Sequence, residues 1–135
     1  MRHGEVQYFT KANPTANATH VELTNRGREQ AIAAGRSLRD IRFDRVITSG
    51  LPRTVETARL VLDASSHSGT LPDPERWPDL EEFRKPKLGG IEEDKIDEAF
   101  LTVFQSVPSR DASYLYGESV GSVVDRVNAQ MSRLH

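Results

Sequence analysis

The stretch "RFDRVITSGLPRTVETARLVLDAS", residues 42–65, contains the change of hydrophobic period that decides the fold. Its β-branched run at residues 46–48 ends in a turn signal, which predicts a short buried strand. The apolar positions that follow have helical spacing. They are Leu51, Val55, Ala58 and Leu62. A strand that leads directly into a helix favours an α/β domain on a largely parallel sheet.

The sequence before this stretch predicts another helix. "HVELTNRGREQAIAAGRSLRDI", residues 20–41, contains Thr24 as a suitable N-cap. Ala31, Gly35 and Leu38 then fall on one face, and the small residues there permit close packing against a neighbour. The order helix, strand, helix with short links again indicates an α/β domain.

The second half of the chain is less regular. Residues 65–78 are rich in turn-forming residues, residues 79–83 predict a short strand or strand end, and residues 109–119 predict a loop. Residues 91–107 predict an amphipathic helix, and a final helix runs from about residue 119 to the last residue. The apolar stripe of that final helix consists of Val120, Val123, Val124, Val127, Met131 and Leu134.

Length and composition restrict the class of protein. A chain of 135 residues fits one domain, here residues 1–135, and it contains no cysteine, which excludes disulfides, thiol catalysis and thiolate metal sites. A net charge of -2 gives no electrostatic case for nucleic acid or an acidic membrane as a partner. No apolar run is long enough for a membrane span or signal core, so we expect a cytoplasmic location.

Two arginines and one histidine lie at positions that an α/β sheet would bring together. "RHGE" at residues 2–5 contains Arg2 and His3, and Arg53 lies in the first turn of the helix that follows the predicted strand. Open α/β sheets place their sites at the carboxyl ends of strands, and a helix N-terminus attracts anions. Two converging arginines would hold a phosphate, and a neutral imidazole between them would attack phosphorus.

Each of these residues has an ordinary alternative when it is taken alone. A single histidine is usually structural or superficial, and Arg53 in an exposed helical turn is by default a solvated side chain. The histidines, at positions 3, 20, 67 and 135, are too scattered to indicate a metal site. The chain also lacks the glycine-lysine ending of a P-loop and the G-x-S-x-G elbow of serine hydrolases.

Taken together, five segments resemble the histidine phosphatase superfamily, the phosphoglycerate mutase-like group. They are "RHGE" (2–5), "LTNRGREQA" (23–31), "ITSGLPRTVETA" (47–58), "LEE" (80–82) and "GES" (117–119). The resemblance implies a three-layer α/β/α fold with a mostly parallel central sheet. It also implies phosphoryl-transfer chemistry without a metal or an organic cofactor.

The resemblance assigns roles to individual residues. His3 matches the histidine that becomes transiently phosphorylated, and Arg2 and Arg53 match the arginines of the phosphate pocket. Glu82, rather than Glu81, matches the acid that protonates the leaving oxygen. Glu118 and Ser119 are interpreted as helix-capping residues rather than as catalytic residues.

Three departures from the family pattern stand out. The family's R-H-G ends a hydrophobic core strand, whereas only Met1 precedes it here. The family's second catalytic histidine lies in an S-H-G-like stretch, which His135 does not match. The asparagine that often follows R-H-G in the family is not evident here. Asn13 and Asn17 are the candidates to take its place. We therefore expect these 135 residues to be an incomplete domain from a longer protein.

Three functions are compatible with these residues and motifs. The leading one is a phosphomonoester hydrolase that acts through phosphohistidine on a small phosphorylated substrate. The second is a phosphoglycerate mutase-type phosphotransferase, for which the basic residues 84, 85 and 87 either meet a second anionic group or are solvated loop side chains. The third is a non-catalytic domain that binds a phospho-ligand or a protein. The final helix needs a cover, which a missing segment or a second copy in a homodimer would supply.

Overall fold

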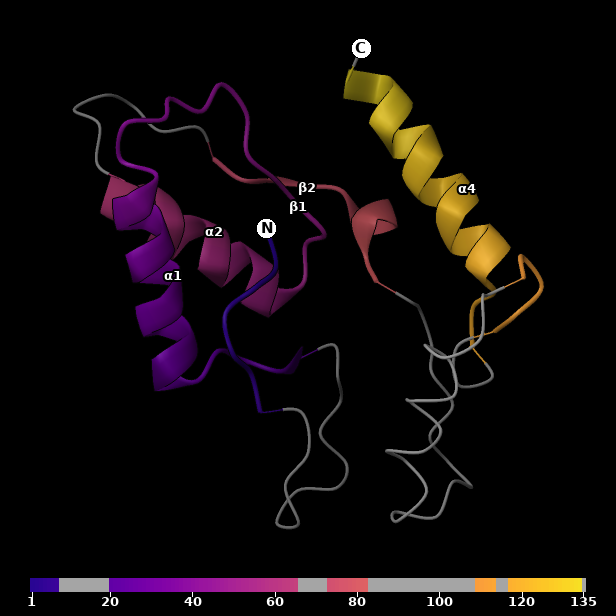
Figure 1. Ribbon diagram of the computed structural model, residues 1–135, viewed down its shortest axis with the longest axis horizontal. Coiled ribbons are helices and arrows are strands. Elements are labelled where there is room, and N and C mark those ends of the chain that lie inside the picture. The colour runs from indigo at the N-terminus through magenta and orange to yellow at the C-terminus, as the bar shows by residue number, and fades with distance from the viewer. Residues whose placement is uncertain (8–19, 66–72, 83–108, 114–116, 135) are drawn as a thin grey trace. The chain divides into compact units, whose positions relative to one another are not determined.

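The computed structural model describes residues 1–7, 20–65, 73–82, 109–113 and 117–134 (Figure 1). These residues belong to two compact units, Met1–Pro78 and Asp79–His135, and each unit is described by itself. The helix predicted at residues 91–107 lies outside the described residues. The assignment of residues 1–135 to a single domain stays a prediction.

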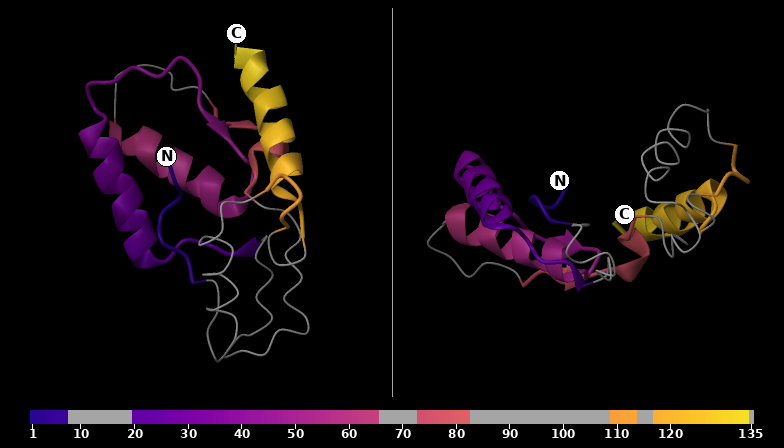
Figure 2. Two further views of the ribbon diagram at one scale, coloured as in Figure 1. Left: turned by 45° about the vertical axis from the view of Figure 1, so that its right-hand side comes forward. Right: turned by 90° about the horizontal axis from the view of Figure 1, so that it is seen from below.

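Two helices dominate the first unit. Helix α1 (Asn25–Ser37) begins where the sequence predicts, because the Thr24 side chain accepts the N–H of Gly27 at 3.0 Å. Helix α2 is Pro52–Ser65, with its proline in the first turn as helices tolerate. The two helices pack side by side in every view (Figures 1 and 2). Both predicted helices are therefore confirmed.

The contact between α1 and α2 depends on small residues. A Cβ built on Gly35 would lie 2.4 Å from the carbonyl oxygen of Val61 and 2.7 Å from the Cβ of Ala64. Glycine is thus required at position 35 for this helix separation. The Arg28 Nε atom also lies 2.6 Å from the Glu56 carboxylate, which links the same two helices. The apolar α2 residues that this packing buries are Val55, Ala58, Val61 and Leu62.

A parallel strand pair accompanies the helices. Strand β1 (Ile47–Thr48) pairs with β2 (Glu75–Arg76), and the N–H of Trp77 continues the ladder to the Thr48 carbonyl at 2.8 Å. Helix α2 lies between these strands in the sequence, as the crossover of a parallel pair requires. Gly50 makes the turn from β1 to α2 at a φ of 88°, a conformation that favours glycine. The predicted α/β arrangement on a parallel sheet is confirmed for the described residues.

Strand β2 corrects the prediction for residues 79–83. The prediction of a strand or strand end is wrong for the described part of that stretch, residues 79–82, because the 3-10 helix η2 (Pro78–Leu80) lies there, and residue 83 is outside the described residues. Proline lacks the N–H that a continuing ladder needs, so the strand ends before position 78. The strand instead precedes it, where Glu75 receives two hydrogen bonds of 2.9 Å from Arg45. The Arg45 guanidinium also lies 5.4 Å from the centroid of the Trp77 ring.

Helix α4 (Val120–Met131) is the main element of the second unit, and η5 (Ser132–Leu134) follows it. Ser119 is its N-cap, as expected, and accepts the N–H of Ser122 at 3.2 Å. In the predicted loop, the carbonyl of Arg110 accepts the N–H of Gly121 and the carbonyl of Ala112 accepts the N–H of Val120, both at 2.8 Å. The first turn of α4 is thereby satisfied within the chain, and the expected helix is confirmed up to Met131.

The apolar stripe of α4 is partly exposed. Val124, Met131 and Leu134 keep 38%, 48% and 42% of their surface accessible. The helices that the structure describes include none that is both long enough and apolar enough to cross a membrane.

Substitution of Gly35 by alanine tests the helix contact. On an exposed helix face Gly→Ala stabilises by about 1 kcal/mol. Here we expect the free energy of unfolding to fall by about 1–2 kcal/mol, because the added methyl group forces α1 and α2 apart. Urea unfolding measures this change. Ala33→Leu, on the exposed face of α1, is the control and should change stability by less than about 0.5 kcal/mol. A stabilised Gly35→Ala variant would contradict the packing.

Candidate active site

The segment that contains His3 is fixed to α2 through one buried hydroxyl. The N–H of Gly4 donates to Thr57 Oγ1 at 3.1 Å, and the Thr57 hydroxyl donates to the carbonyl oxygen of Arg53 at 2.7 Å. The Thr57 residue is only 3% exposed. Its single proton and one of its two lone pairs are therefore used, and they connect the His3 segment to the first turn of α2.

The same segment is fixed to α1 through Glu5. The backbone N–H of Glu5 donates to the side-chain oxygen of Gln30 at 2.9 Å, and its carbonyl accepts the N–H of Thr24 at the same distance. The Thr24 hydroxyl donates to the Glu5 carboxylate at 3.0 Å. An isolated antiparallel bridge between Val6 and Leu23 continues this attachment. Both peptide groups of Glu5 are thus held by residues at the start of α1.

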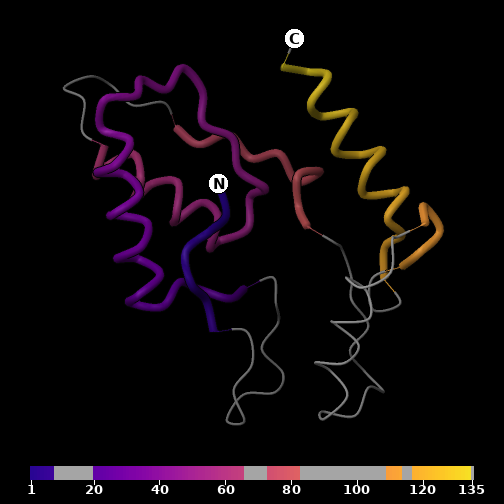
Figure 3. Tube along the Cα trace, in the orientation of Figure 1, coloured from indigo at the N-terminus to yellow at the C-terminus, as the bar shows by residue number. Residues whose placement is uncertain are grey.

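Two glycines allow this close approach. A Cβ on Gly4 would lie 2.3 Å from the Gly27 carbonyl oxygen, and a Cβ on Gly27 would lie 2.2 Å from the Glu5 carbonyl oxygen. Figure 3 shows the N-terminal segment, in indigo, running past the beginning of α1. Any side chain at either position would displace the segment from the helix. Glycine is therefore needed at both positions for the observed path of the backbone after His3.

The hydrogen bond of the His3 ring determines its tautomer. The Nδ1 atom lies 2.7 Å from the carbonyl oxygen of Gly4. Because a carbonyl oxygen only accepts, Nδ1 must carry the proton. In the neutral imidazole the other ring nitrogen, Nε2, is then the unprotonated one. The His3 residue is half-buried.

The two predicted phosphate-binding arginines belong to the same unit as His3. Arg2 is exposed and directly precedes it in the chain. Arg53 lies in the first turn of α2 and is 7% exposed. The alternative that Arg53 is a solvated side chain is therefore wrong. Arg53 lies at the N-terminus of α2, the end of a helix that favours anions.

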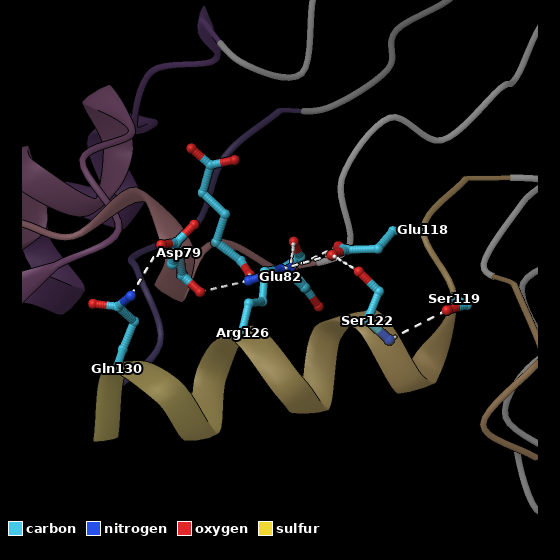
Figure 4. Close-up of polar contacts among 8 residues, drawn as sticks. Asp79, Glu82, Glu118, Ser119, Ser122, Arg126 and Gln130 are labelled. Atoms are coloured by element: carbon cyan, nitrogen blue, oxygen red, sulfur yellow. Dashed lines mark hydrogen bonds and ion pairs between the residues drawn. The ribbon is translucent and has the colours of Figure 1, made fainter. Parts of the chain in front are cut away.

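Glu82 lies in the second unit, where its backbone is bound by Arg126 of α4 (Figure 4). The Glu82 carbonyl accepts from Arg126 Nη2 at 2.8 Å, and residue 82 is exposed. Glu118 corrects a prediction. It was expected to cap α4, but its carboxylate binds Arg126 at 2.8 Å and the Ser122 hydroxyl at 2.9 Å. Only Ser119 of the expected pair acts as the cap.

Sequence reasoning did not assign the residues that hold these segments. Thr57, Gln30, Gly27 and Arg126 received no role, although the first three are letters of the motifs that carry the family resemblance. The presence of these three residues in the motif segments was the signal that could have identified them. Arg126 lies in α4, and Glu118 lies directly before the N-cap of that helix, so no regular spacing in the sequence predicts their contact.

Other candidate residues lie outside the described part of the chain. They are Asn13, Asn17, Arg84, Lys85 and Lys87. Among the residues that are described, no group of three or more His, Asp or Glu side chains is arranged to hold a metal ion.

Comparison with protein families gives one match along the whole chain. Residues 1–135 match the histidine phosphatase superfamily (branch 1). The chain belongs to this superfamily. It is 38% identical over 68 residues to fructose-2,6-bisphosphatase TIGAR B of Danio rerio, a match that covers 50% of the chain and 26% of that protein. It is 28% identical over 130 residues to a 2,3-bisphosphoglycerate-dependent phosphoglycerate mutase of Chlamydia trachomatis, which covers 96% of the chain and 53% of the mutase.

Solved structures confirm the predicted phosphoglycerate mutase-like fold. A candidate alpha-ribazole-5'-P phosphatase from Escherichia coli K-12 has a TM-score of 0.67 at 28% identity, covering 99% of this chain and 64% of that protein. A mycobacterial hydrolase has a TM-score of 0.70 at 22% identity, covering 98% of this chain and 62% of that one, and supports the fold alone. The matches that run along almost the whole chain thus cover between 53% and 64% of the length of these relatives.

Replacement of Thr57 by valine tests how the His3 segment is held. Valine has the same shape but leaves the buried N–H of Gly4 without its acceptor, so we expect the free energy of unfolding to fall by about 1–3 kcal/mol. Hydrogen exchange at the Gly4 amide should become faster in parallel. Thr57→Ser, which restores the hydroxyl, is the matched control and should keep the Gly4 amide protected. Unchanged exchange in the valine variant would show that another group holds the segment.

Proposed function

We propose that this protein is a phosphomonoester hydrolase that acts through a phosphohistidine on a small phosphorylated substrate. His3 is the nucleophile, Arg2 and Arg53 bind the phosphate, and Glu82 is the general acid. The observation that carries the proposal is the hydrogen bond from His3 Nδ1 to the Gly4 carbonyl, which leaves the lone pair on Nε2. Membership of the histidine phosphatase superfamily supports the same chemistry.

The reaction needs two displacements at phosphorus. Nε2 of His3 forms a bond to phosphorus while the bond to the leaving oxygen breaks, and that oxygen takes its proton from the Glu82 carboxyl. Water then attacks the phosphohistidine, Glu82 recovers a proton from the water, and inorganic phosphate leaves Nε2. The arginines offset the negative charge of the equatorial oxygens, so no metal or organic cofactor is required.

A phosphoglycerate mutase-type reaction is the second candidate, because the mutase of Chlamydia trachomatis matches 96% of the chain. It shares the first displacement and differs in the second, where a hydroxyl of the bound product replaces water. The fate of the phosphoryl group separates the two. Release as inorganic phosphate identifies the hydrolase, whereas retention in an organic phosphate identifies the mutase. Binding of vanadate without turnover would indicate the third, non-catalytic function.

The cellular setting is a proposal of the same kind. Absence of cysteine and a net charge of -2 support a cytoplasmic protein that binds neither nucleic acid nor an acidic membrane surface. A homodimer would cover the exposed apolar side chains of α4.

Labelling of His3 tests the proposed nucleophile. The protein is incubated with a ³²P-labelled phosphomonoester and quenched in alkali, in which phosphohistidine is stable. We expect label on the parent protein, and we expect His3→Ala to lose both the label and turnover, the latter by a factor of about 10³ or more. His20→Ala removes an exposed histidine of the same unit and is the control, with label and turnover retained. A His3→Ala variant that still accepts label would exclude His3 as the nucleophile.

A further inference from the structure

Arg126 uses its entire hydrogen-bonding capacity within the second unit. Nε donates to one oxygen of Glu118 at 2.8 Å, and Nη2 donates to the other oxygen at the same distance. Nη1 donates to the carbonyl oxygens of Asp79 and Glu81 at 2.7 and 2.5 Å. The second proton of Nη2 binds the Glu82 carbonyl at 2.8 Å. These are five bonds, and a guanidinium has five N–H donors.

This arrangement excludes one ordinary function of arginine. A guanidinium that binds substrate phosphate must keep donors available for it. Arg126 has none left, and its side chain is only 11% exposed. Its ligands are instead three carbonyl groups within residues 79–82, which is the segment that ends at Glu82 (Figure 4). Arg126 therefore holds the backbone conformation of this segment and does not bind a ligand.

Glu118 makes the arrangement rigid. Its carboxylate receives two parallel bonds from Arg126 and a third from the Ser122 hydroxyl, and its side chain is also 11% exposed. Hydrogen bonding to Glu118 raises the pKa of Arg126, despite the opposing effect of burial, so the guanidinium stays charged. Bidentate pairing fixes the plane of the guanidinium, and with it the directions of the remaining three donors.

Helix α4 supplies most of these groups from one face. Residues 122, 126 and 130 recur at intervals of four, which brings them to the same side of the helix, and Glu118 lies directly before its N-cap, Ser119. The last of them, Gln130, donates its side-chain N–H to the Asp79 carboxylate at 2.9 Å. Both ends of the segment, Asp79 and Glu82, are thus attached to α4, while residue 82 itself is exposed.

We propose that Arg126, oriented by Glu118, is a positioning residue for the general acid, and this inference rests on the role of Glu82 proposed above. The backbone of Asp79, Glu81 and Glu82 is held by one guanidinium, and the Glu82 carboxyl projects from a fixed peptide group. A general acid must lie within hydrogen-bond reach of the leaving oxygen, and small displacements of its backbone remove that reach. Arg126 thereby affects proton donation without contacting the substrate.

The dependence of rate on the leaving group tests this role. A good leaving group, such as p-nitrophenolate, departs without protonation, whereas an alkoxide requires an acid. We therefore compare kcat/KM for p-nitrophenyl phosphate with that for an alkyl phosphate, in Arg126→Met and in Glu82→Gln. Both variants should lose on the order of 10²-fold on the alkyl phosphate and less than about threefold on the aryl phosphate.

Two further variants make the comparison decisive. Arg110→Met removes an arginine of the same unit whose ion pair with Asp125 is exposed, and it should leave both rates unchanged. Arg126→Lys keeps the charge beside Glu118, which favours folding, but has only three donors, so it should show the same selective loss as Arg126→Met. It provides the measurement if the methionine variant does not fold.

The outcomes separate the two proposals. A selective loss in Glu82→Gln together with an equal loss on both substrates in the Arg126 variants would overturn the positioning role and leave Glu82 as the acid. Unchanged rates in the Arg126 variants would also overturn the positioning role of Arg126 and leave Glu82 as the acid. A Glu82→Gln variant without leaving-group dependence would overturn the acid assignment itself, and the role of Arg126 would fall with it.

Discussion

The hydroxyl of Thr57 is the point on which the His3 segment depends. It accepts the N–H of Gly4 and donates to the carbonyl of Arg53, so one buried atom connects the backbone after His3, the proposed nucleophile, to the first turn of α2. The contact is possible only because Gly4 approaches Gly27 without a side chain on either residue. Local geometry at His3 is therefore determined by residues from α1 and α2 that do no chemistry themselves.

This division between chemical and supporting residues explains the motif spacing. Thr24, Gly27 and Gln30 occupy the start of α1 at intervals of three, which places each of them toward the peptide groups of residues 4 and 5. Arg126 and Glu118 have the corresponding function for residues 79–82 in the second unit. In both units the backbone beside the proposed catalytic residue is held by hydrogen bonds to its carbonyl or N–H groups.

Local sequence patterns predicted the elements that local physics determines. The Thr24 cap of α1 and the change of period at residue 50 both concern neighbours in the chain, and both were predicted correctly. Strand β2 was missed because it has two polar residues and depends on Arg45, thirty positions away. The burial of Arg53 and the partner of Gly4, which is 53 residues distant, could not be predicted for the same reason. The Glu118 error arose because a glutamate before a helix predicts a cap, whereas its actual partner lies two turns along α4.

The protonation of the His3 ring is the central claim, because the nucleophile role proposed for His3 requires an unprotonated Nε2. Two-dimensional ¹H–¹⁵N spectroscopy of protein labelled at histidine nitrogens, recorded in alkaline buffer, measures it directly. The hydrogen bond to Gly4 predicts a protonated Nδ1 and an unprotonated Nε2 in His3. A resonance pattern with the proton on Nε2 would contradict the account, since the nitrogen that must attack phosphorus would then have no lone pair to offer.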